Sequence, residues 1–432
     1  MSLLSSPLTL QCGLELPNRL TKAAMAEKMA PEQNPDDKFP RAYSEWANGG
    51  WGLILTGNVQ VSQTYLNSPG DVAILPPNAA TPGLQEAWRD WATTIQRSGT
   101  PALVQLSHPG RQSPPGAGRR SFLTKNLAPS SVALNLGSGF VARIAARVMF
   151  GSPREMTRAE VTEAIQQFID GGKQAHLAGF KGIELHGAHG FLISQFLSPK
   201  TNLRTDEFGG NPAKRAEMVL RIIKGIRAVT SPQFCVGIKM NSVDVSEQGD
   251  GGLQAGLEQM GLIIDAGVDF IEISGGSFED PSMFPVDRTA PVIGSTAAPM
   301  APALIPKAGT MAREAFFLEF AKIVREHYPK IPLMVTGGFR SRAGMEAALE
   351  SGACDIIGIG RPAAVVPKLP KLVLLNKEIL DADATIRLKR LEMGWPMRTV
   401  PIKSLRAGAE STYYGEQIER MGKGLRPIDT RV

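Results

Sequence analysis

His186 and His189 stand three residues apart, directly after an apolar run of the sequence. Two imidazoles at this spacing can bind a metal ion, hold a polar group of a ligand, or serve the structure alone. Zinc requires at least a third protein ligand, and His108 is the only further imidazole that we expect nearby. A metal site is therefore disfavoured, and the elements around the histidines must decide between the other two interpretations.

Lys239 lies inside the apolar run VGIKM, where a charged residue is unusual. Lysine is almost never fully buried unless it is paired, and Glu184 or Glu272 could form an ion pair with it inside the fold. Alternatively, Lys239 is a fixed positive charge beside an electron-rich ligand. A third interpretation makes it the Schiff-base amine of a non-redox lyase or isomerase.

Eight short apolar runs alternate with amphipathic stretches along the chain. Continuous apolar runs of this length are typical of strands buried on both faces, as in parallel sheets. We expect strands at residues 19–25, 51–57, 101–107, 179–186, 234–240, 268–274, 331–338 and 354–360. Strict strand–helix alternation over eight units predicts a (β/α)8 TIM barrel. A doubly wound sheet is the alternative, but no GxGxxG motif opens a first strand–helix unit.

The stretches between the runs carry the signals of helix ends. Thr157 and Glu160 have the spacing of a capping box, and Gly179 is a natural stop for the helix that follows them. Amphipathic patterns of the same kind predict further helices at residues 211–229, 253–267, 313–328 and 341–353.

Three features depart from a plain barrel. The first twenty residues predict a short hairpin that caps the bottom of the barrel. Residues 108–157 and 275–312 form long connections after the third and sixth strands, on the face where barrel enzymes have their active sites. Loops of that length are usually lids or binding loops. We expect residues 1–370 to form the barrel, and residues 371–432 to be an extension that packs on it or on a partner subunit of a homo-oligomer.

Composition places the chain among soluble globular proteins, with 43% hydrophobic and 20% charged residues. No apolar run reaches the ~20 residues of a membrane span, and the N-terminus lacks the pattern of a signal peptide. Three scattered cysteines favour a reducing, cytoplasmic setting over a disulfide framework. The net charge of +6 comes without a block of like charges, which argues against nucleic acid as a partner.

Glycines end the two last strands of the expected barrel. Gly337 and Gly338 follow strand seven, and Gly360 with Arg361 follows strand eight. Backbone N–H groups exposed at these two strand ends form the recurring phosphate site of the fold, although tight turns would need glycine as well. Arg361 adds a charge-assisted donor for a phosphate.

A flat, phosphorylated cofactor suits the groups at the other strand ends. Met25 offers an apolar surface after strand one, and Gln105 can pair with the pyrimidine edge of a ring. Lys239 can stabilise negative charge on a reduced isoalloxazine. Flavin mononucleotide (FMN) fits this combination of groups.

The chain resembles the Old Yellow Enzyme family of FMN-dependent NAD(P)H oxidoreductases. The motifs that carry the resemblance occur in the family's order and are LPNRL, VQLSHPGRQ, ELHGAHGFLISQFLSPKTNLRTDEFGG followed by RAEM, VGIKMNS and GACDIIGIGRP. The match runs from about Leu8 to about Pro370. The segment 184–210 is its most specific part.

The resemblance implies roles for individual residues. His186 and His189 are implied to grip the carbonyl or other activating group of the substrate. Phe191 stands in the substrate site where the family commonly has a proton-donating tyrosine, so solvent, or a side chain such as Tyr65, must take that role. Residues implied to bind FMN are Ala24, Met25, Ala26, Asn58, Gln105, Lys239, Gly337, Gly338, Gly360 and Arg361.

We therefore expect an ene-reductase that takes hydride from NADPH or NADH and reduces an electron-poor alkene, a small-molecule substrate. Two alternatives stay open. One is the lyase or isomerase that uses Lys239. The other is a flavin enzyme acting on amines or dienoyl thioesters, although the iron–sulfur cysteines and extra nucleotide domains of those longer relatives are missing from this sequence.

Overall fold

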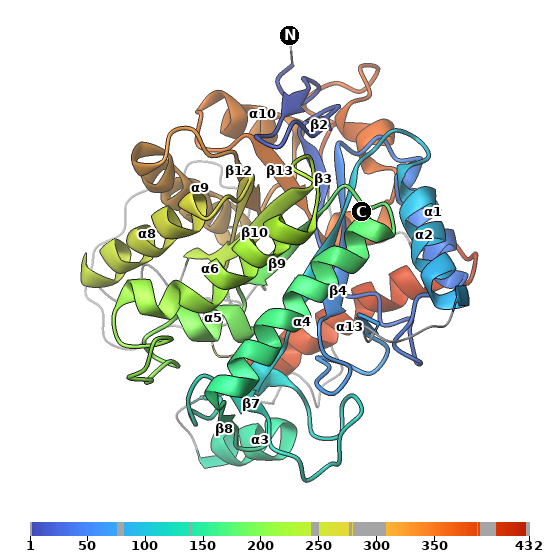
Figure 1. Cartoon of the computed structure of the whole chain (residues 1–432). Coiled ribbons are helices and arrows are strands. Elements are labelled where there is room, and N and C mark those ends of the chain that lie inside the picture. The colour runs from blue at the N-terminus through green and yellow to red at the C-terminus, as the bar shows by residue number, and fades with distance from the viewer. Residues whose placement is uncertain are drawn as a thin grey trace.

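The structure is a computed structural model that describes residues 2–75, 82–137, 140–242, 250–275, 279, 308–386, 388 and 403–428. Its centre is a ring of eight parallel strands surrounded by helices (Figure 1). The ring contains β3 (Leu20–Lys22), β4 (Leu53–Gln60), β6 (Ala102–Ser107), β9 (Gly182–Gly187), β10 (Cys235–Asn241), β11 (Phe270–Ser274), β12 (Leu333–Thr336) and β13 (Ile356–Ile359). Pairing of β3 with both β13 and β4 closes the ring. The predicted (β/α)8 TIM barrel is confirmed.

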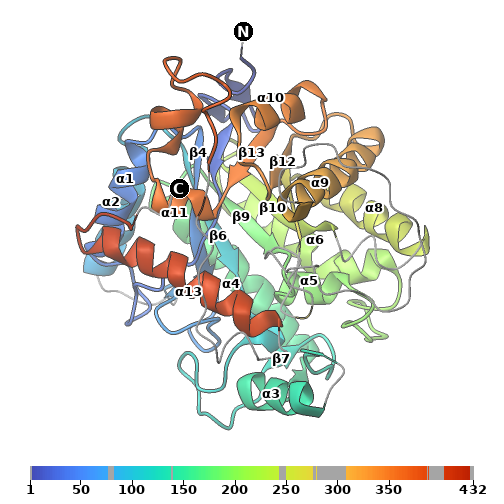
Figure 2. The ribbon, with the colours of Figure 1, turned by 180° about the vertical axis from the view of Figure 1, so that it is seen from behind.

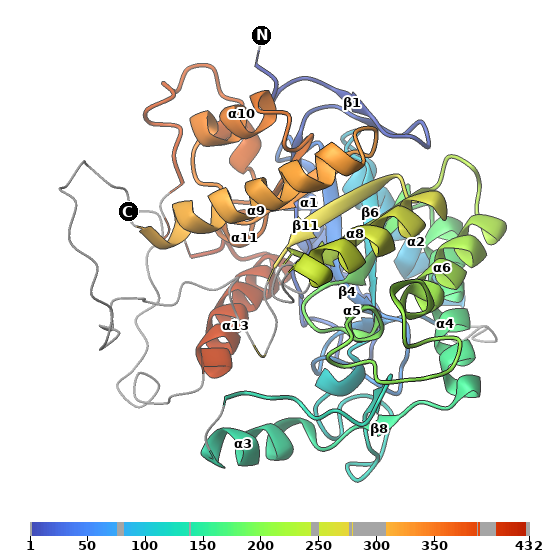
Figure 3. The same ribbon diagram turned by 90° about the vertical axis from the view of Figure 1, so that its left-hand side faces the viewer.

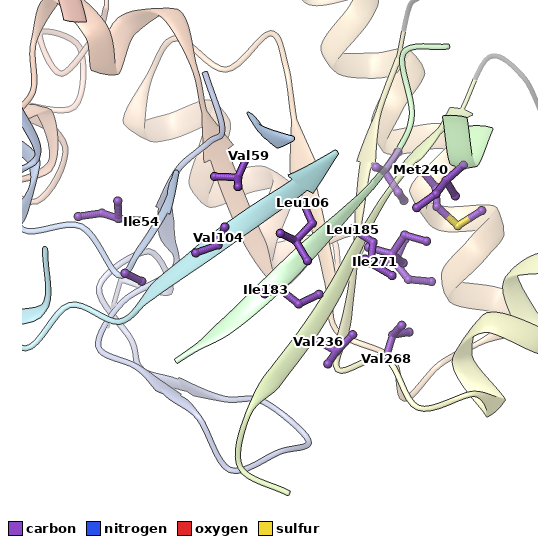
Figure 4. Close-up of a cluster of buried hydrophobic side chains, with 14 of the residues drawn as sticks. Ile54, Val59, Val104, Leu106, Ile183, Leu185, Val236, Met240, Val268 and Ile271 are labelled. Carbon is purple, nitrogen blue, oxygen red and sulfur yellow. The ribbon is translucent and has the colours of Figure 1, made fainter. Parts of the chain in front are cut away.

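The barrel strands are apolar on both faces, which explains their continuous apolar sequences. In β4, Leu53 and Leu55 belong to the cluster inside the barrel, whereas Ile54 belongs to the cluster between the strands and the helices. The outer cluster continues around the ring through Val104, Ile183, Leu185, Val236 and Ile271 (Figure 4).

The predicted hairpin is present at the N-terminal end of the barrel. Strands β1 (Leu8–Thr9) and β2 (Glu15–Leu16) pair in antiparallel fashion. Leu10 and Leu16 belong to the cluster inside the barrel, so the hairpin closes this end. It also brings the Cys12 thiol within 4.8 Å of the Cys235 thiol and an Asp269 oxygen, a proximity that the scattered cysteines of the sequence do not reveal.

Helices surround the barrel, and all but the first two lie at the places that the amphipathic stretches predict. Their bounds are α1 (Lys38–Ala47), α2 (Pro82–Gln96), α4 (Arg158–Leu177), α6 (Pro212–Val229), α8 (Asp250–Asp265), α9 (Ala308–His327) and α10 (Arg342–Glu350). The capping box is confirmed, because Thr157 Oγ1 accepts from Glu160 N at 3.2 Å and Glu160 Oε2 accepts from Thr157 N at 2.9 Å. Gly179 follows α4 with a φ of +92°, in the left-handed region that ends many helices.

The connection after the third barrel strand has its own small elements. These are η1 (Gly110–Gln112), β7 (Leu127–Ala128), α3 (Phe140–Phe150) and β8 (Arg154–Glu155). Helix α3 lies at the end of the molecule opposite the hairpin (Figure 3). Most of the predicted long loop 275–312 lies outside the described residues. The remaining elements near the barrel are β5 (Val72–Ala73), which pairs with β4, and α5 (Leu192–Leu197).

The end of the chain returns to the barrel. After the eighth strand come α11 (Arg361–Val365) and η2 (Pro370–Leu374), and later α13 (Lys403–Gly422). Helix α13 packs against α1 and α11, at the end of the barrel opposite the hairpin (Figures 1 and 2). Arg41 Nη1 donates to Gly422 O at 3.3 Å. No helix among the described residues is both long and apolar enough to cross a bilayer.

Candidate active site

A cavity of about 680 Å³ opens where the barrel strands deliver their C-terminal residues. This volume is typical of a site for a cofactor or a small ligand. Its wall contains every residue that the sequence predicts for the site: Ala24, Met25, Ala26, Asn58, Gln105, His186, His189, Phe191, Lys239, Gly337, Gly338, Gly360 and Arg361. Strand ends that are far apart in the sequence therefore meet around one cavity.

The two histidines form a compact pair at the end of β9. Their ring centroids lie 5.0 Å apart and their planes cross at 78°. His189 has a φ of +58°, a conformation that residues with a side chain seldom adopt and that clusters at functional sites. His189 Nε2 lies 3.1 Å from Ser274 Oγ, and Gln112 Nε2 donates to His189 O at 2.9 Å. These contacts fix the direction of the second imidazole.

Both imidazoles are neutral near pH 7. Burial is the main cause that holds the pKa of His186 well below its ordinary value, helped by His189 and by the charge of Lys239. Burial and then Lys239 lower the pKa of His189 in the same way. A neutral imidazole has one N–H donor, so each ring can donate one hydrogen bond without offering positive charge. His186 Nδ1 accepts from Ala188 N at 3.4 Å, which leaves its N–H on Nε2, whereas His189 Nε2 is engaged with Ser274 Oγ.

Lys239 combines two of the interpretations that the sequence left open. Its Nζ lies 2.9 Å from Glu272 Oε1 and 3.9 Å from Glu184 Oε2, and it also lines the cavity. Burial by itself lowers the pKa of Lys239, but the carboxylates of Glu272 and Glu184 outweigh burial and raise it. The amine therefore stays protonated, which disfavours a nucleophilic Schiff-base role.

Gln105 stands between this charge cluster and the cavity. Its Nε2 donates to Glu184 Oε2 at 2.5 Å, and its backbone N donates to Thr56 Oγ1 at 3.1 Å. Burial, and next the charge of Glu272, raise the pKa of Glu184 well above its usual value. The amide of Gln105 is thus fixed in orientation, with its nitrogen directed to the cluster.

The ends of β12 and β13 form a wall with little side-chain bulk. Gly337 and Gly338 have φ values of +137° and +85°, which favour glycine. A Cβ atom added to Gly337 would lie 2.8 Å from the Phe317 ring, and one added to Gly358 would lie 1.8 Å from Thr336 Oγ1. Within the described residues, that buried hydroxyl has no hydrogen-bond partner. A phosphate of FMN fits this bare wall and its unsatisfied hydroxyl.

Arg361 lines the same part of the cavity but already has a protein partner. Its Nη1 lies 2.7 Å from Glu410 Oε2, which belongs to α13. The guanidinium predicted for a phosphate therefore also joins the barrel to its C-terminal helix, a contact that no sequence pattern indicates.

Sequence comparisons decide the family. The model of the NADH:flavin oxidoreductase / NADH oxidase family matches residues 4–283 of the 432-residue chain. An NADH-dependent flavin oxidoreductase of Hypocrea jecorina (strain QM6a) is 44% identical over 402 residues, which cover 93% of this chain and 96% of that relative. The chain belongs to this family. The resemblance to Old Yellow Enzyme is confirmed, and the protein is an FMN-dependent oxidoreductase that uses a nicotinamide hydride donor.

Two further comparisons extend the relationship. An NADH-dependent flavin oxidoreductase of Neonectria sp. (strain DH2) is 45% identical over 416 residues, and this chain, 94% of which is matched, spans 52% of that relative's length. The solved structure of morphinone reductase superposes with a TM-score of 0.63 at 21% identity, covering 84% of this chain and 87% of the other. At that identity the likeness shows the barrel fold alone.

Phe191, which the resemblance puts where the family commonly has tyrosine, lies in the cavity wall. Its ring centroid lies 4.3 Å from that of His186, and the side chain is buried. Tyr65, the side chain considered as a substitute proton donor, does not belong to the described cavity wall. Its ring lies 5.7 Å from the His108 ring, with the Arg120 guanidinium 4.9 Å from its centroid.

Several residues in the cavity wall of this flavin oxidoreductase were not predicted from its sequence. Gln112 belongs to a recognised motif, but no pattern predicts that its side chain lies beside His189. Lys28 lies two residues after Ala26, and that closeness to an expected site residue was the available signal. Three further wall residues come from α13, whose sequence contains no family motif: Ser411, Thr412 and Tyr414.

Proposed function

We propose that the protein reduces the C=C bond of α,β-unsaturated carbonyl compounds, with NADH or NADPH as hydride donor and with His186 and His189 binding the activating carbonyl. The observation that carries the proposal is the pair of buried, neutral imidazoles that meet in the wall of the cavity. Two directed N–H donors without charge suit a carbonyl oxygen that gains negative charge during the reaction.

FMN, when bound, supplies the exchange of hydride with the nicotinamide donor and with the alkene. We assign its binding to Ala24, Met25, Ala26, Asn58, Gln105, Lys239, Gly337, Gly338, Gly360 and Arg361, all of which line the cavity. The fixed ammonium of Lys239 places positive charge where an electron-rich ring is expected. The glycine wall and the Thr336 hydroxyl suit the phosphate.

The histidine pair orients and polarises the substrate. Each N–H donor that stabilises an oxyanion contributes about 10²–10³-fold to the rate in comparable sites. Phe191 cannot donate a proton, so we assign the proton at the substrate α-carbon to water that enters the cavity. The N–H groups of His186 and His189 remain on the carbonyl throughout.

We propose that residues 371–432 extend the barrel of residues 1–370 and complete its active site. The cavity-lining residues of α13 and the ion pair between Arg361 and Glu410 support this assignment. The small number of cysteines, at positions 12, 235 and 354 only, supports a cytoplasmic location.

Anaerobic turnover tests the proposal. The purified protein should be yellow, release FMN on acid treatment, and oxidise NADH or NADPH only while 2-cyclohexenone or N-ethylmaleimide is reduced. A colourless protein whose Lys239 is trapped by borohydride with a carbonyl substrate would instead support the lyase or isomerase interpretation.

A further inference from the structure

The cavity wall carries an excess of positive charge. No aspartate or glutamate lies among the described residues of the wall, whereas four cationic side chains do: Lys28, Lys239, Arg340 and Arg361. A cavity lined by one sign of charge attracts ligands of the other sign and raises their local concentration. The phosphate of FMN is one such ligand, and the partners of the four cations show whether a second is expected.

Three of the four cations are held by groups of the protein. Lys239 Nζ lies 2.9 Å from Glu272 Oε1, and Arg361 Nη1 lies 2.7 Å from Glu410 Oε2. Arg340 Nη1 donates to a backbone carbonyl at 2.7 Å. Their charges are therefore wholly or partly balanced before any ligand enters.

Lys28 differs from these three. Within the described part of the chain, no hydrogen bond or ion pair holds its ammonium, although the side chain is partly buried. Its stem lies against α13, because a Cβ atom added to Gly415 would be 3.8 Å from Lys28 Cδ. The ammonium thus belongs to a wall formed by the loop after β3 and by the C-terminal helix.

The backbone of Lys28 is held in a demanding conformation. Its φ of +56° is in the left-handed region, and His189 shares that property on the same cavity wall. Ala30 N donates to Gly70 O at 2.9 Å, and a Cβ atom on Gly70 would lie 2.6 Å from Lys28 O. The neighbouring loop therefore packs tightly on Lys28 and fixes its direction. Strained positions that the surrounding structure enforces occur preferentially at binding sites.

A rigid pair of polar residues lies on the same side of the cavity. Asn67 and Ser68 line the wall, and Asp71 Oδ2 accepts their backbone N–H groups at 3.1 and 2.9 Å. Gln60 Nε2 donates to the same oxygen at 2.9 Å. Asp71 holds this loop through Oδ2, and among the described residues it forms no ion pair with Lys28.

We propose that Lys28 binds an anionic oxygen group of a cavity ligand, either a carboxylate carried by the alkene substrate or the pyrophosphate of the nicotinamide donor. The inference rests on the proposed function. If the anion is the substrate carboxylate, it narrows the substrate class to alkenes that bear an anionic substituent apart from the activating carbonyl; if it is the pyrophosphate, it assigns a contact to the nicotinamide donor. A charge-assisted hydrogen bond of this kind changes affinity about 10- to 100-fold.

The test compares two maleimides of the same reactivity, N-ethylmaleimide and N-(carboxymethyl)maleimide, with the FMN-loaded protein. The readouts are the ratio of kcat/KM for the acid to kcat/KM for the neutral compound, and the ratio of calorimetric Kd values for 4-hydroxybenzoate and 4-hydroxybenzamide. If Lys28 binds a substrate carboxylate, Lys28→Met should shift both ratios about 10- to 100-fold against the anion, and Lys28→Arg should restore most of the preference. Lys377→Met, which removes an exposed lysine outside the cavity wall, is the matched control for net charge.

A second arm identifies the source of the anion. Flavin reduction by NADH is compared with reduction by 1-benzyl-1,4-dihydronicotinamide, which lacks the pyrophosphate. A Lys28→Met effect confined to NADH assigns the pyrophosphate, and one confined to the acidic maleimide assigns the substrate carboxylate. Equal effects on charged and neutral partners in both arms, or the same shifts in Lys377→Met, would overturn the inference. Failure of the wild-type protein to bind FMN or to reduce N-ethylmaleimide would instead refute the proposed function.

Discussion

Arg361 Nη1 at the end of the barrel lies 2.7 Å from Glu410 Oε2 on the C-terminal helix. This contact joins the wall that suits the FMN phosphate to α13, which lines the same cavity. Cofactor retention and the docking of α13 should therefore depend on one guanidinium.

Arg361→Ala should weaken FMN retention, because a charge-assisted hydrogen bond contributes roughly 1.5–3 kcal/mol. Equilibrium dialysis of the apoprotein against FMN measures the loss. Glu410→Ala is the matched control, since it breaks the ion pair and keeps the guanidinium. Equal losses in both variants would mean that Arg361 acts through α13 and not through the phosphate.

Replacing both histidines by alanine should leave FMN bound and weaken the binding of phenolic ligands over the flavin. Two neutral hydrogen bonds at about 1 kcal/mol each predict a loss of roughly 2 kcal/mol, or about 30-fold in Kd. The spectral change on titration with 4-hydroxybenzaldehyde reports the affinity. Unchanged affinity in the double variant would remove His186 and His189 from the substrate site.

Ligand binding should show no histidine titration near pH 6.5. Burial keeps the pKa of His186 and of His189 well below that value in the folded protein. A carbonyl ligand such as 4-hydroxybenzamide, titrated between pH 8 and pH 6, should therefore keep a constant Kd. A rise or fall in affinity with a midpoint at pH 6.5 would show that one of the imidazoles is protonated in this range.

Lys22 should make the free energy of unfolding depend on alkaline pH. Burial lowers its pKa from the ordinary 10.5 to about 8, although Nζ donates to Leu55 O at 2.8 Å. Between those values the unfolded chain holds more protons than the folded protein, so stability due to this group increases as pH rises from 8 to 10.5. Urea unfolding at pH 8 and pH 10 measures this change in the free energy of unfolding. Wild type should gain stability relative to Lys22→Met, and identical pH profiles would contradict the lowered pKa.

Phe191→Tyr should restore a proton donor beside His186, whose ring lies 4.3 Å from the Phe191 ring. General acid catalysis contributes about 10²–10⁴-fold, and weakly activated substrates need it most. Stopped-flow reoxidation should accelerate more with 2-cyclohexenone than with N-ethylmaleimide. The same rates in variant and wild type for both substrates would mean that proton delivery does not limit the reaction.

The barrel was predictable because each of its strands is buried on both faces and therefore reads as an apolar run. The run predicted at 234–240 corresponds to β10 at Cys235–Asn241, so each predicted bound differs from the observed bound by one residue. The capping box at Thr157 was equally predictable, since its hydrogen bonds are local. The strand ends then placed the histidines, Lys239 and the glycines on one face without further information.

The contacts that remained hidden are those made between distant segments. Residues 411–414 meet the loop of Met25 across almost the whole chain, and nothing in the local sequence of α13 indicates a ligand. Tyr65 follows a strand end, but its ring turns toward His108 and Arg120. From the sequence, Lys239 could either form an ion pair or lie beside the ligand. In the structure it does both, because the barrel interior is narrow: its Nζ contacts Glu272, and its side chain lines the cavity.

The central claim is that this barrel transfers hydride from a nicotinamide to an alkene whose carbonyl is held by the histidine pair. Reduction of 2-methyl-2-cyclohexenone with NADH in D₂O, followed by NMR of the product, tests it most directly. The account predicts one hydrogen from NADH at the unsubstituted carbon and one deuterium from solvent at the carbon that bears the methyl group. A product without this pattern, or no reduced product from FMN-loaded protein, would contradict it.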